Sequence, residues 1–227
     1  MTPSLRRPVR VAGASGGFSD RVRAISSLAA NEDVDVIVGD WLSEMTMTIH
    51  GTGKVRNQSA LANKVLSFEE QVANAMFAEN FLDCFEPAID DLARRKIKLA
   101  VNAGASDTEI LAKLVKQKVK ERGYDLNVAW VEGDEVTDAV MKMKAKGEGF
   151  SSLMHGKTLD EWGLDPVCAQ CYLGGLGIGK CVPTSSRYNR SVNVLTNCLA
   201  ARALTEGADI VICGRVSDAS PIIGAAA

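Results

Sequence analysis

Five short runs rich in β-branched residues constrain the fold of this sequence more than any other feature. The runs are Val9–Ala12, Val34–Val38, Ile97–Val101, Asn127–Val131 and Asp209–Cys213, and small or polar residues follow each of them. Continuous apolar runs of this length are typical of strands that are buried on both faces, as in a parallel sheet. Helical patterns separate the runs, and strands that alternate with helices indicate an α/β fold. We therefore predict a mainly parallel sheet with helices on both of its faces.

Four segments between these runs predict helices. Asp20–Ala30 places its apolar residues on one helical face, and Phe68–Cys84 and Glu86–Arg95 read as a helical pair broken at Pro87. The fourth segment, Asp107–Arg122, is strongly amphipathic, with apolar residues inward and lysines outward. Its lysine-rich face indicates a solvated surface rather than a binding patch.

Length, charge and apolar content narrow the classes of function. With 227 residues, the chain is long enough to form one large domain and to bury its core. The formal net charge of -2 supplies no basic field for nucleic acid or for an anionic membrane surface. No apolar run approaches the roughly 18 residues of a membrane helix, and the N-terminal segment lacks the apolar stretch of a signal peptide. These features predict a cytoplasmic protein without a nucleic-acid or membrane partner.

Thiol and imidazole chemistry has few candidates in this sequence. Of the six cysteines, Cys168 and Cys171 form a C-x-x-C pair, a spacing that redox enzymes and zinc sites use. Redox pairs usually open a helix, whereas this pair precedes Tyr-Leu-Gly-Gly, and no second pair stands at zinc spacing, so a structural role is favoured. His50 and His155 are the only histidines, each in a glycine-rich loop context. We therefore predict no metal site and expect carboxylates, arginine, lysine or tyrosine to move any protons.

The loop after the first strand contains Gly13, Ser15, Gly16 and Gly17. In a parallel sheet, ligands bind beyond the carboxyl ends of the strands, where this loop lies. Its glycines would let backbone N–H groups approach a phosphate or a coenzyme A-like group at the start of the next helix. The spacing does not satisfy the dinucleotide fingerprint G-x-G-x-x-G. A tight turn that needs glycine for steric reasons is an equally good interpretation.

The loop after the second strand contains Asp40 and Glu44. If the chain is helical from Trp41 onward, the two carboxylates share one face and could act together as acid and base. The alternative is that Asp40 caps the helix and Glu44 is a carboxylate of its first turn. The sequence leaves both interpretations open.

Arg215 leaves the last strand directly after Gly214, and Asp218 stands three residues further on. An arginine at this edge suits a carboxylate or phosphate group of a substrate, because packing seldom requires one there. Asp218 could act with it or could cap the next helix. Asn102, Gly104 and Tyr172 complete the candidate ligand-binding residues.

Several of these loops resemble the successive motifs of the acyclic terpene utilisation (AtuA-like) family. The matching segments are VRVAGASGGFSDR, DVIVGDWLSEMTM, KLAVNAGAS, CYLGGLGI and EGADIVICGRVSDAS, of which the last is the most specific. The resemblance covers essentially the whole chain and implies a Rossmann-like α/β fold in a single domain over residues 1–227. It also implies a role in the breakdown of acyclic terpenes such as citronellol and geraniol. Relatives commonly neighbour acyl-CoA carboxylases and enoyl-CoA hydratases, which points to an acyl-CoA or branched carboxylate substrate.

Two hypotheses about function follow from the resemblance. In the first, the protein is an enzyme that carries out a lyase- or hydratase-like step on a branched acyl substrate, in catabolism or in a secondary-metabolite pathway. Asp40, Glu44, Arg215 and Asp218 are its candidate catalytic residues, and a CoA thioester is a candidate substrate rather than a cofactor. In the second, the chain is a non-catalytic or truncated subunit that binds an acyl-CoA enzyme. Partners other than a small molecule would be a second copy of the chain, or a carboxylase or hydratase of the same pathway.

The sequence departs from the family pattern in two places. Residues 179–200 interrupt the run from the Tyr-Leu-Gly-Gly motif to the last strand with a polar segment of no clear period. Gly179-Lys180-Cys181 can be encoded with an ideal splice donor, and Leu199-Ala200 with an acceptor, so that excision would stay in frame. We interpret the segment as a retained intron, in preference to a genuine surface loop. The chain also stops just after the last motif, where the family domain continues, so we expect the fold to be incomplete at its C-terminus.

Overall fold

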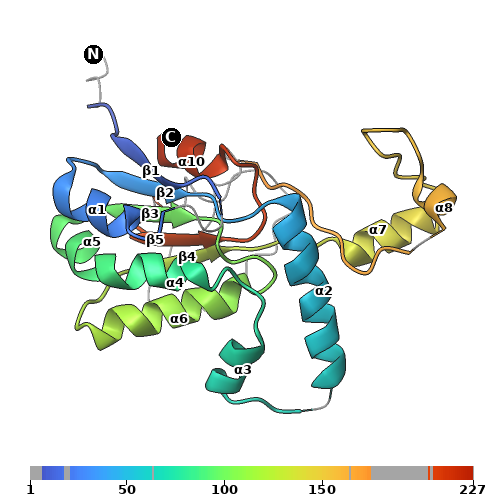
Figure 1. Cartoon of the computed structure of the whole chain (residues 1–227), viewed down its shortest axis with the longest axis horizontal. Coiled ribbons are helices and arrows are strands. Elements are labelled where there is room, and N and C mark those ends of the chain that lie inside the picture. The colour runs from blue at the N-terminus through green and yellow to red at the C-terminus, as the bar shows by residue number, and fades with distance from the viewer. Residues whose placement is uncertain are drawn as a thin grey trace.

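The computed structural model describes residues 7–17, 21–62, 64–163, 165–174, 204 and 207–226. Its centre is a sheet of five strands, β1 (Val11–Ser15), β2 (Val36–Gly39), β3 (Lys98–Val101), β4 (Val128–Val131) and β5 (Ile210–Cys213). The strands lie in the order β1-β2-β3-β5-β4, and every neighbouring pair is parallel (Figure 1). All five predicted strands are therefore confirmed, each within two residues of its expected start.

Both faces of the sheet are buried, which explains why the strands read as continuous apolar runs. Ile37, Leu99 and Ile212 point into one hydrophobic core. Val38 and Val211 point into a second core on the opposite face. Successive residues of a strand alternate between the faces, so each strand needs apolar side chains at nearly every position.

Helices cover both faces, as predicted. The first face carries α1 (Ala24–Asn31), α4 (Asn80–Phe85), the 3₁₀ turn η1 (Glu86–Ala88), α5 (Ile89–Arg95) and α6 (Thr108–Glu121). The opposite face carries α10 (Ser220–Ala226), which packs on β1, β2 and β3 (Figure 1). The loop after β3 thus leads to one face and the loop after β5 to the other. Two neighbouring strands whose connections diverge in this way mark the place where α/β sheets usually bind ligands.

The prediction of a continuous helix over Phe68–Cys84 is wrong. The structure has α3 (Phe68–Asn74), then a non-helical stretch, and then α4. The interruption has a clear cause, because the loop after β3 binds the backbone there. The Asp107 carboxylate accepts the N–H of Met76 at 2.8 Å, and the Ala103 carbonyl accepts the N–H of Ala78 at 2.9 Å. The expected break at Pro87 takes the form of the 3₁₀ turn.

Three further helices have no strong counterpart in the sequence analysis. They are α2 (Glu44–Ala60), α7 (Thr137–Lys144) and α8 (Leu159–Trp162). A helix from Trp41 onward was one of two alternatives for this loop, but α2 begins three residues later, at Glu44. Helices α7 and α8 lie on an arm that projects away from the sheet and its covering helices (Figure 1). Within the described ranges, no helix has both the length and the apolar content that a membrane span requires.

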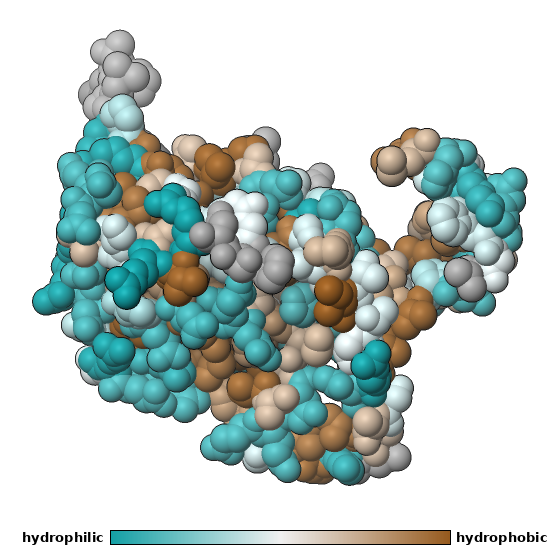
Figure 2. Space-filling model, in the orientation of Figure 1, coloured by the Kyte–Doolittle hydropathy of each residue, from teal (hydrophilic) through white to brown (hydrophobic). Residues whose placement is uncertain are grey.

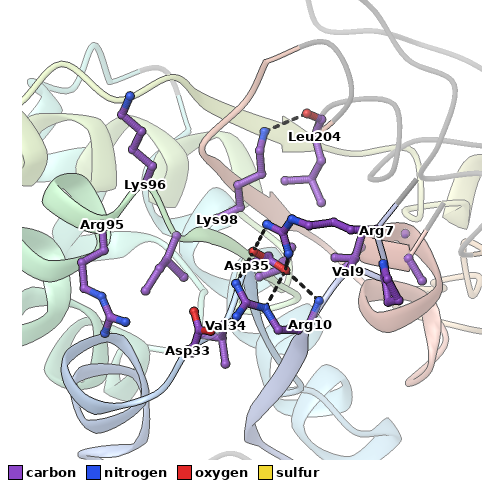
Figure 3. A pocket seen from close by; sticks show the side chains of 16 residues that line it. Arg7, Val9, Arg10, Asp33, Val34, Asp35, Arg95, Lys96, Lys98 and Leu204 are labelled. Atoms are coloured by element: carbon purple, nitrogen blue, oxygen red, sulfur yellow. Dashed lines mark hydrogen bonds and ion pairs between the residues drawn. The ribbon is translucent and has the colours of Figure 1, made fainter. Parts of the chain in front are cut away.

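An ion-pair cluster closes the amino edge of the sheet. Asp35, just before β2, accepts hydrogen bonds from Arg7 at 2.6 and 2.9 Å and from the backbone N–H of Arg10 at 2.8 Å (Figure 3). The guanidinium groups of Arg7 and Arg10 hold the pKa of the Asp35 carboxyl well below its usual range. Beside them, the Lys98 ammonium donates to the carbonyls of Leu204 and Ala208, both at 2.8 Å. The cluster fastens the segment before β1 to the start of β2.

Candidate functional site

A small cavity of about 180 Å³ lies at the carboxyl edge of the sheet. Gly16 and Gly17 of the loop after β1 form one side of it, and the segment from Asp40 to the start of α2 forms another. Arg215 and Asp218, which follow β5, complete the lining. The structure thus brings together residues from three strand-end loops that are far apart in the sequence.

Arg215 is the centre of this site. Its side chain is only 4% exposed, and its Nη1 donates to the Leu42 carbonyl at 2.9 Å. Its Nη2 lies 3.4 Å from Glu44 Oε1 and 3.2 Å from Asp218 Oδ1. The two carboxylates are open to solvent, with side-chain exposures of 76% and 71%. A buried cation therefore holds two accessible carboxylates next to each other. The guanidinium group of Arg215 already binds the Leu42 carbonyl and both carboxylates. That Arg215 also binds an anionic group of a ligand therefore stays a prediction.

Tyr172 covers the guanidinium group of Arg215. The centre of its ring lies 4.3 Å from the Arg215 Cζ, within the range of a cation–π contact. Its hydroxyl donates a hydrogen bond to Glu44 Oε1, so that Tyr172 and Arg215 bind the same carboxylate oxygen. The phenol is half exposed. Its hydroxyl is a third group, beside the two carboxylates, that can transfer a proton.

Helix α2 begins at the site, and its start corrects both earlier interpretations of Asp40. Ser43, and not Asp40, is the N-cap: its hydroxyl accepts the N–H of Thr46 in a capping box. Asp40 and Glu44 therefore do not share a helical face, since Asp40 precedes the helix by four residues. Glu44 is a first-turn carboxylate, as the second interpretation expected. It lies where the helix dipole favours negative charge.

Asp40 is held by neighbouring loops as well as facing the cavity. Its carboxylate accepts the N–H of Leu42 at 3.2 Å and a hydrogen bond from the amide of Asn102. Asn102 is completely buried, and its Oδ1 accepts the N–H of Trp41 at 2.6 Å. Ser15 donates to the Asp40 carbonyl at 3.0 Å. Asn102 and Ser15 therefore position the segment around Asp40 rather than line the cavity.

The predicted glycines divide into two groups. Gly16 and Gly17 line the cavity, whereas the exposed Gly13 is not part of its lining. Gly104 and Gly214 are needed for close packing between loops. A Cβ on Gly104 would lie 2.7 Å from the Cys213 carbonyl, and one on Gly214 would lie 2.5 Å from the carboxylate of the residue at position 134. Neither position leaves room for a side chain.

That carboxylate belongs to Asp134, which the sequence analysis did not select. Asp134 follows β4 and is 5% exposed, and its Oδ2 accepts the backbone N–H of Arg215 at 2.8 Å. Its own carbonyl accepts the N–H of Cys171, next to Tyr172, at 2.7 Å. Burial raises its pKa to about 6. The sequence signal that could have identified Asp134 is its position, since it is an acidic residue next to a glycine at the end of a strand.

A second polar cavity of about 230 Å³ lies on the other side of Asp134. Lys54 of α2 contributes to its lining and pairs with Asp107 at 2.9 Å. Glu132 also lines it, and burial raises the pKa of this carboxyl. The Ser106 hydroxyl at its wall is buried without a hydrogen-bond partner. Polar groups therefore extend along the carboxyl edge from β1 to β4.

The thiols agree with a structural role. Cys168 and Cys171 are free, and burial raises the pKa of both, which disfavours the reactive thiolate. They lie in an extended segment beside Glu135, not at the start of a helix. A Cβ on Gly51 of α2 would overlap the Cys168 thiol, so this cysteine packs on α2.

The two histidines lie away from the cavity. His50 was expected in a loop but lies inside α2, and its half-buried ring has a pKa below the ordinary value because of desolvation. His155 lies on an exposed turn against Trp162. Across the described part of the chain, no group of three metal-binding side chains could hold a metal ion.

A larger cavity, of about 890 Å³, lies at the opposite, amino edge of the sheet. Three of its cations are already engaged: Arg7 and Arg10 with Asp35, and Lys98 with backbone carbonyls (Figure 3). Ligands of parallel α/β sheets bind at the carboxyl edge. We therefore place the candidate site around Arg215.

These features define an α/β protein with Rossmann-like topology and a carboxylate–arginine site at the carboxyl edge of its sheet. The chain belongs to the acyclic terpene utilisation family, AtuA, whose sequence model matches residues 9–186 and 198–227. The description of the family implies a role in acyclic terpene utilisation. No curated protein and no solved structure matches the chain.

The family match also bears on the segment 179–200. It is interrupted between residues 186 and 198, inside that segment, and it includes residues 179–186. The segment itself lies outside the described residues. The retained-intron interpretation therefore stays a prediction.

Proposed function

We propose that this protein is a lyase- or hydratase-like enzyme that adds water to, or removes it from, a branched acyl substrate of acyclic terpene metabolism. One observation carries the proposal: Glu44 and Asp218 are both solvent-accessible and both lie within 3.4 Å of the same nitrogen of Arg215. Two carboxylates at one small cavity can serve as the base and the acid of a proton transfer. Arg215 offsets the repulsion between them.

In the hydration direction, one carboxylate accepts a proton from a water molecule while the water oxygen bonds to the β-carbon of an α,β-unsaturated acyl group. The α-carbon then receives a proton from the second carboxyl group or from the Tyr172 hydroxyl. Elimination is the reverse sequence, and protons balance in both directions. Tyr172 also fixes Glu44, because its hydroxyl binds the same oxygen as Arg215.

The charge of the cavity favours a thioester over a free acid. Among the described residues, Arg215 is the only cation that lines it, whereas three carboxylates do: Asp40, Glu44 and Asp218. A free carboxylate would add a fourth negative charge next to them. The neutral thioester carbonyl of an acyl-CoA avoids this repulsion.

The volume of the cavity limits which part of an acyl-CoA it can hold. About 180 Å³ is below the range of roughly 300–1,000 Å³ of sites that enclose a drug-sized ligand. The reacting part of the acyl chain would occupy it, and the nucleotide of coenzyme A would lie outside. Gly16 and Gly17 line the cavity, and a Cβ on either would meet no atom within 4 Å, so this side of the cavity leaves open space beside the acyl group.

The test is an assay of the full chain with branched α,β-unsaturated acyl-CoA thioesters and with the matching 3-hydroxyacyl-CoA thioesters. Mass spectrometry follows the gain or loss of one water. We expect turnover with the wild type and a loss of roughly 100-fold or more in Glu44→Gln and Asp218→Asn. Glu69→Gln, an exposed carboxylate on α3, is the matched control and should keep full activity. Absence of turnover with every thioester, together with capture of an acyl-CoA enzyme, would instead favour the non-catalytic subunit.

A further inference from the structure

The arm that carries α7 and α8 has no core of its own. It leaves the sheet after β4 and returns at Gln170, and it stands apart from the body of the molecule (Figure 1). None of its described residues from 135 to 167 is buried. Both helices are short, with eight residues in α7 and four in α8. Isolated helices of this length are not stable in water, because nucleation is costly and tertiary packing supplies most helical stability.

The contacts that hold the arm together are polar and exposed. Lys144 at the end of α7 pairs with Asp160 at 3.0 Å and with Asp165 at 2.9 Å. Thr158 and Glu161 form a capping box at the start of α8. Exposed ion pairs contribute little to stability, because solvent screens them, and they do not offset the entropy cost of ordering a segment of this length.

Large apolar side chains lie open on the same arm. Leu153 is 104% exposed and Met154 91% exposed, relative to a fully accessible residue of the same type. Met141, Met143, Trp162 and Val167 are also exposed. Figure 2 shows the arm as a separate lobe on which hydrophobic and hydrophilic surface alternate. Apolar side chains that gather on a projecting, coreless segment mark an interaction surface.

We propose that the arm is a dimerisation element that packs against the arm of a second copy of this chain. Charge favours this partner. Residues 137–167 contain four lysines and five acidic residues, so the arm is nearly neutral. Two arms therefore do not repel each other, and the arm offers no net charge to attract a strongly charged partner. In α7 the acidic Asp138 lies at the start, and Lys142 and Lys144 at the end. Antiparallel packing about a two-fold axis brings the acidic end of each helix to the basic end of its partner.

The extent of the arm also suits a dimer. A stable interface uses roughly 20–30 residues on each side, and the arm contains 31 residues, 137–167, from which such a surface can form. The base of the arm adjoins the candidate site. Val136 donates to the Ala169 carbonyl at 2.9 Å, and Tyr172 follows three residues later. Dimerisation would therefore steady the segment that places Tyr172 on Arg215. The inference stands on the arm alone and does not depend on the proposed reaction.

Sedimentation of the full chain over a wide range of concentration tests the proposal. The wild type should form a dimer, and Leu153→Ser with Met154→Ser should raise the dimer dissociation constant about tenfold or more. Val65→Ser is the matched control, since Val65 is 101% exposed but lies between α2 and α3, outside the arm. It should dimerise like the wild type. A wild type that stays monomeric, or a double variant that dimerises equally well, overturns the proposal.

A second measurement needs no substitution. Isotopically light and heavy chains are mixed, allowed to exchange and treated with a lysine cross-linker. Cross-links between light and heavy chains should join Lys142, Lys146 and Lys157 of the arms. Dominant cross-links through the exposed lysines of α6, Lys113 and Lys116, would place the contact elsewhere and overturn the proposal.

Discussion

The carboxylate of Asp134 accepts the backbone N–H of Arg215 at 2.8 Å inside the protein, and this contact ties the end of β4 to the residue at the centre of the candidate site. The same residue binds the N–H of Cys171 through its carbonyl. Asp134 therefore fixes two segments at once, the one that carries Arg215 and the one that carries Tyr172. It acts by positioning these residues.

Asp134 should make stability depend on pH. Burial raises its pKa from an ordinary value of 3.8 to about 6, so the folded chain keeps a proton that the unfolded chain releases. As pH rises from below about 4 to above about 6, the unfolded state is favoured by releasing this proton, and the free energy of unfolding falls by about 3 kcal/mol in all for this group. Asp134→Asn keeps the acceptor for Arg215 but cannot ionise. Denaturant unfolding across this pH range should show the decline in the wild type relative to the variant, and parallel curves would contradict the assignment.

Gly214 should not tolerate alanine. A Cβ at this position would lie 2.5–2.8 Å from the Asp134 carboxylate, so the two strand ends would have to separate. We expect Gly214→Ala to lower the free energy of unfolding by about 1–3 kcal/mol. Gly174→Ala is the control, because a Cβ there meets no atom within 4 Å. Equal stability of the two variants in urea titration would show that the packing at Gly214 is not constrained.

Asn102 should matter for stability more than its small side chain suggests. It is completely buried, accepts the N–H of Trp41 at 2.6 Å and donates to Asp40. Asn102→Ala leaves the Trp41 N–H and the Asp40 carboxylate without these partners, at a cost of about 1–3 kcal/mol. The exposed Asn31 is a matched control, and Asn31→Ala should change the free energy of unfolding by less than about 0.5 kcal/mol. A thermal or urea unfolding series that ranks the two variants equally would contradict this account.

The interruption of the family match inside residues 179–200 leads to a test of the retained-intron interpretation. The interpretation predicts that deletion of Lys180–Ala200 together with Gly179→Ala restores the family pattern. Translated intron carries no selected pattern of apolar residues, so we expect the deletion to raise soluble yield or the free energy of unfolding. Loss of folding on deletion would mean that the segment is a genuine part of the domain. Sequencing of the transcript is the independent check.

The fold was predictable from local patterns, whereas the connections within the site were not. Runs such as Val34–Val38 must be buried on both faces, and that requirement alone indicates a parallel sheet. Helix α2 was hard to predict because its residues are mainly threonine, glycine and polar side chains, with no apolar face. The break after α3 depends on the distant Asp107, which no local pattern contains.

In the site, likewise, the residues were predictable from the sequence but their contacts with one another were not. Strand-end position was enough to select Arg215, Glu44 and Asp218, since parallel strands bring their carboxyl ends to one edge. It could not show that Arg215 is buried and paired with both carboxylates, because that depends on side-chain packing. Asp134 was missed because nothing in the sequence separates it from its acidic neighbours Glu132 and Glu135, which are less buried.

Proton exchange at the α-carbon of a substrate tests the central claim most directly. A branched 3-hydroxyacyl-CoA is incubated with the full chain in D₂O, and deuterium at the α-carbon is followed by NMR. If Glu44 and Asp218 move protons at this site, the wild type should introduce deuterium, and Glu44→Gln and Asp218→Asn should do so roughly 100-fold or more slowly. Exchange that is absent in the wild type, or equally fast in both variants and the wild type, would contradict the account.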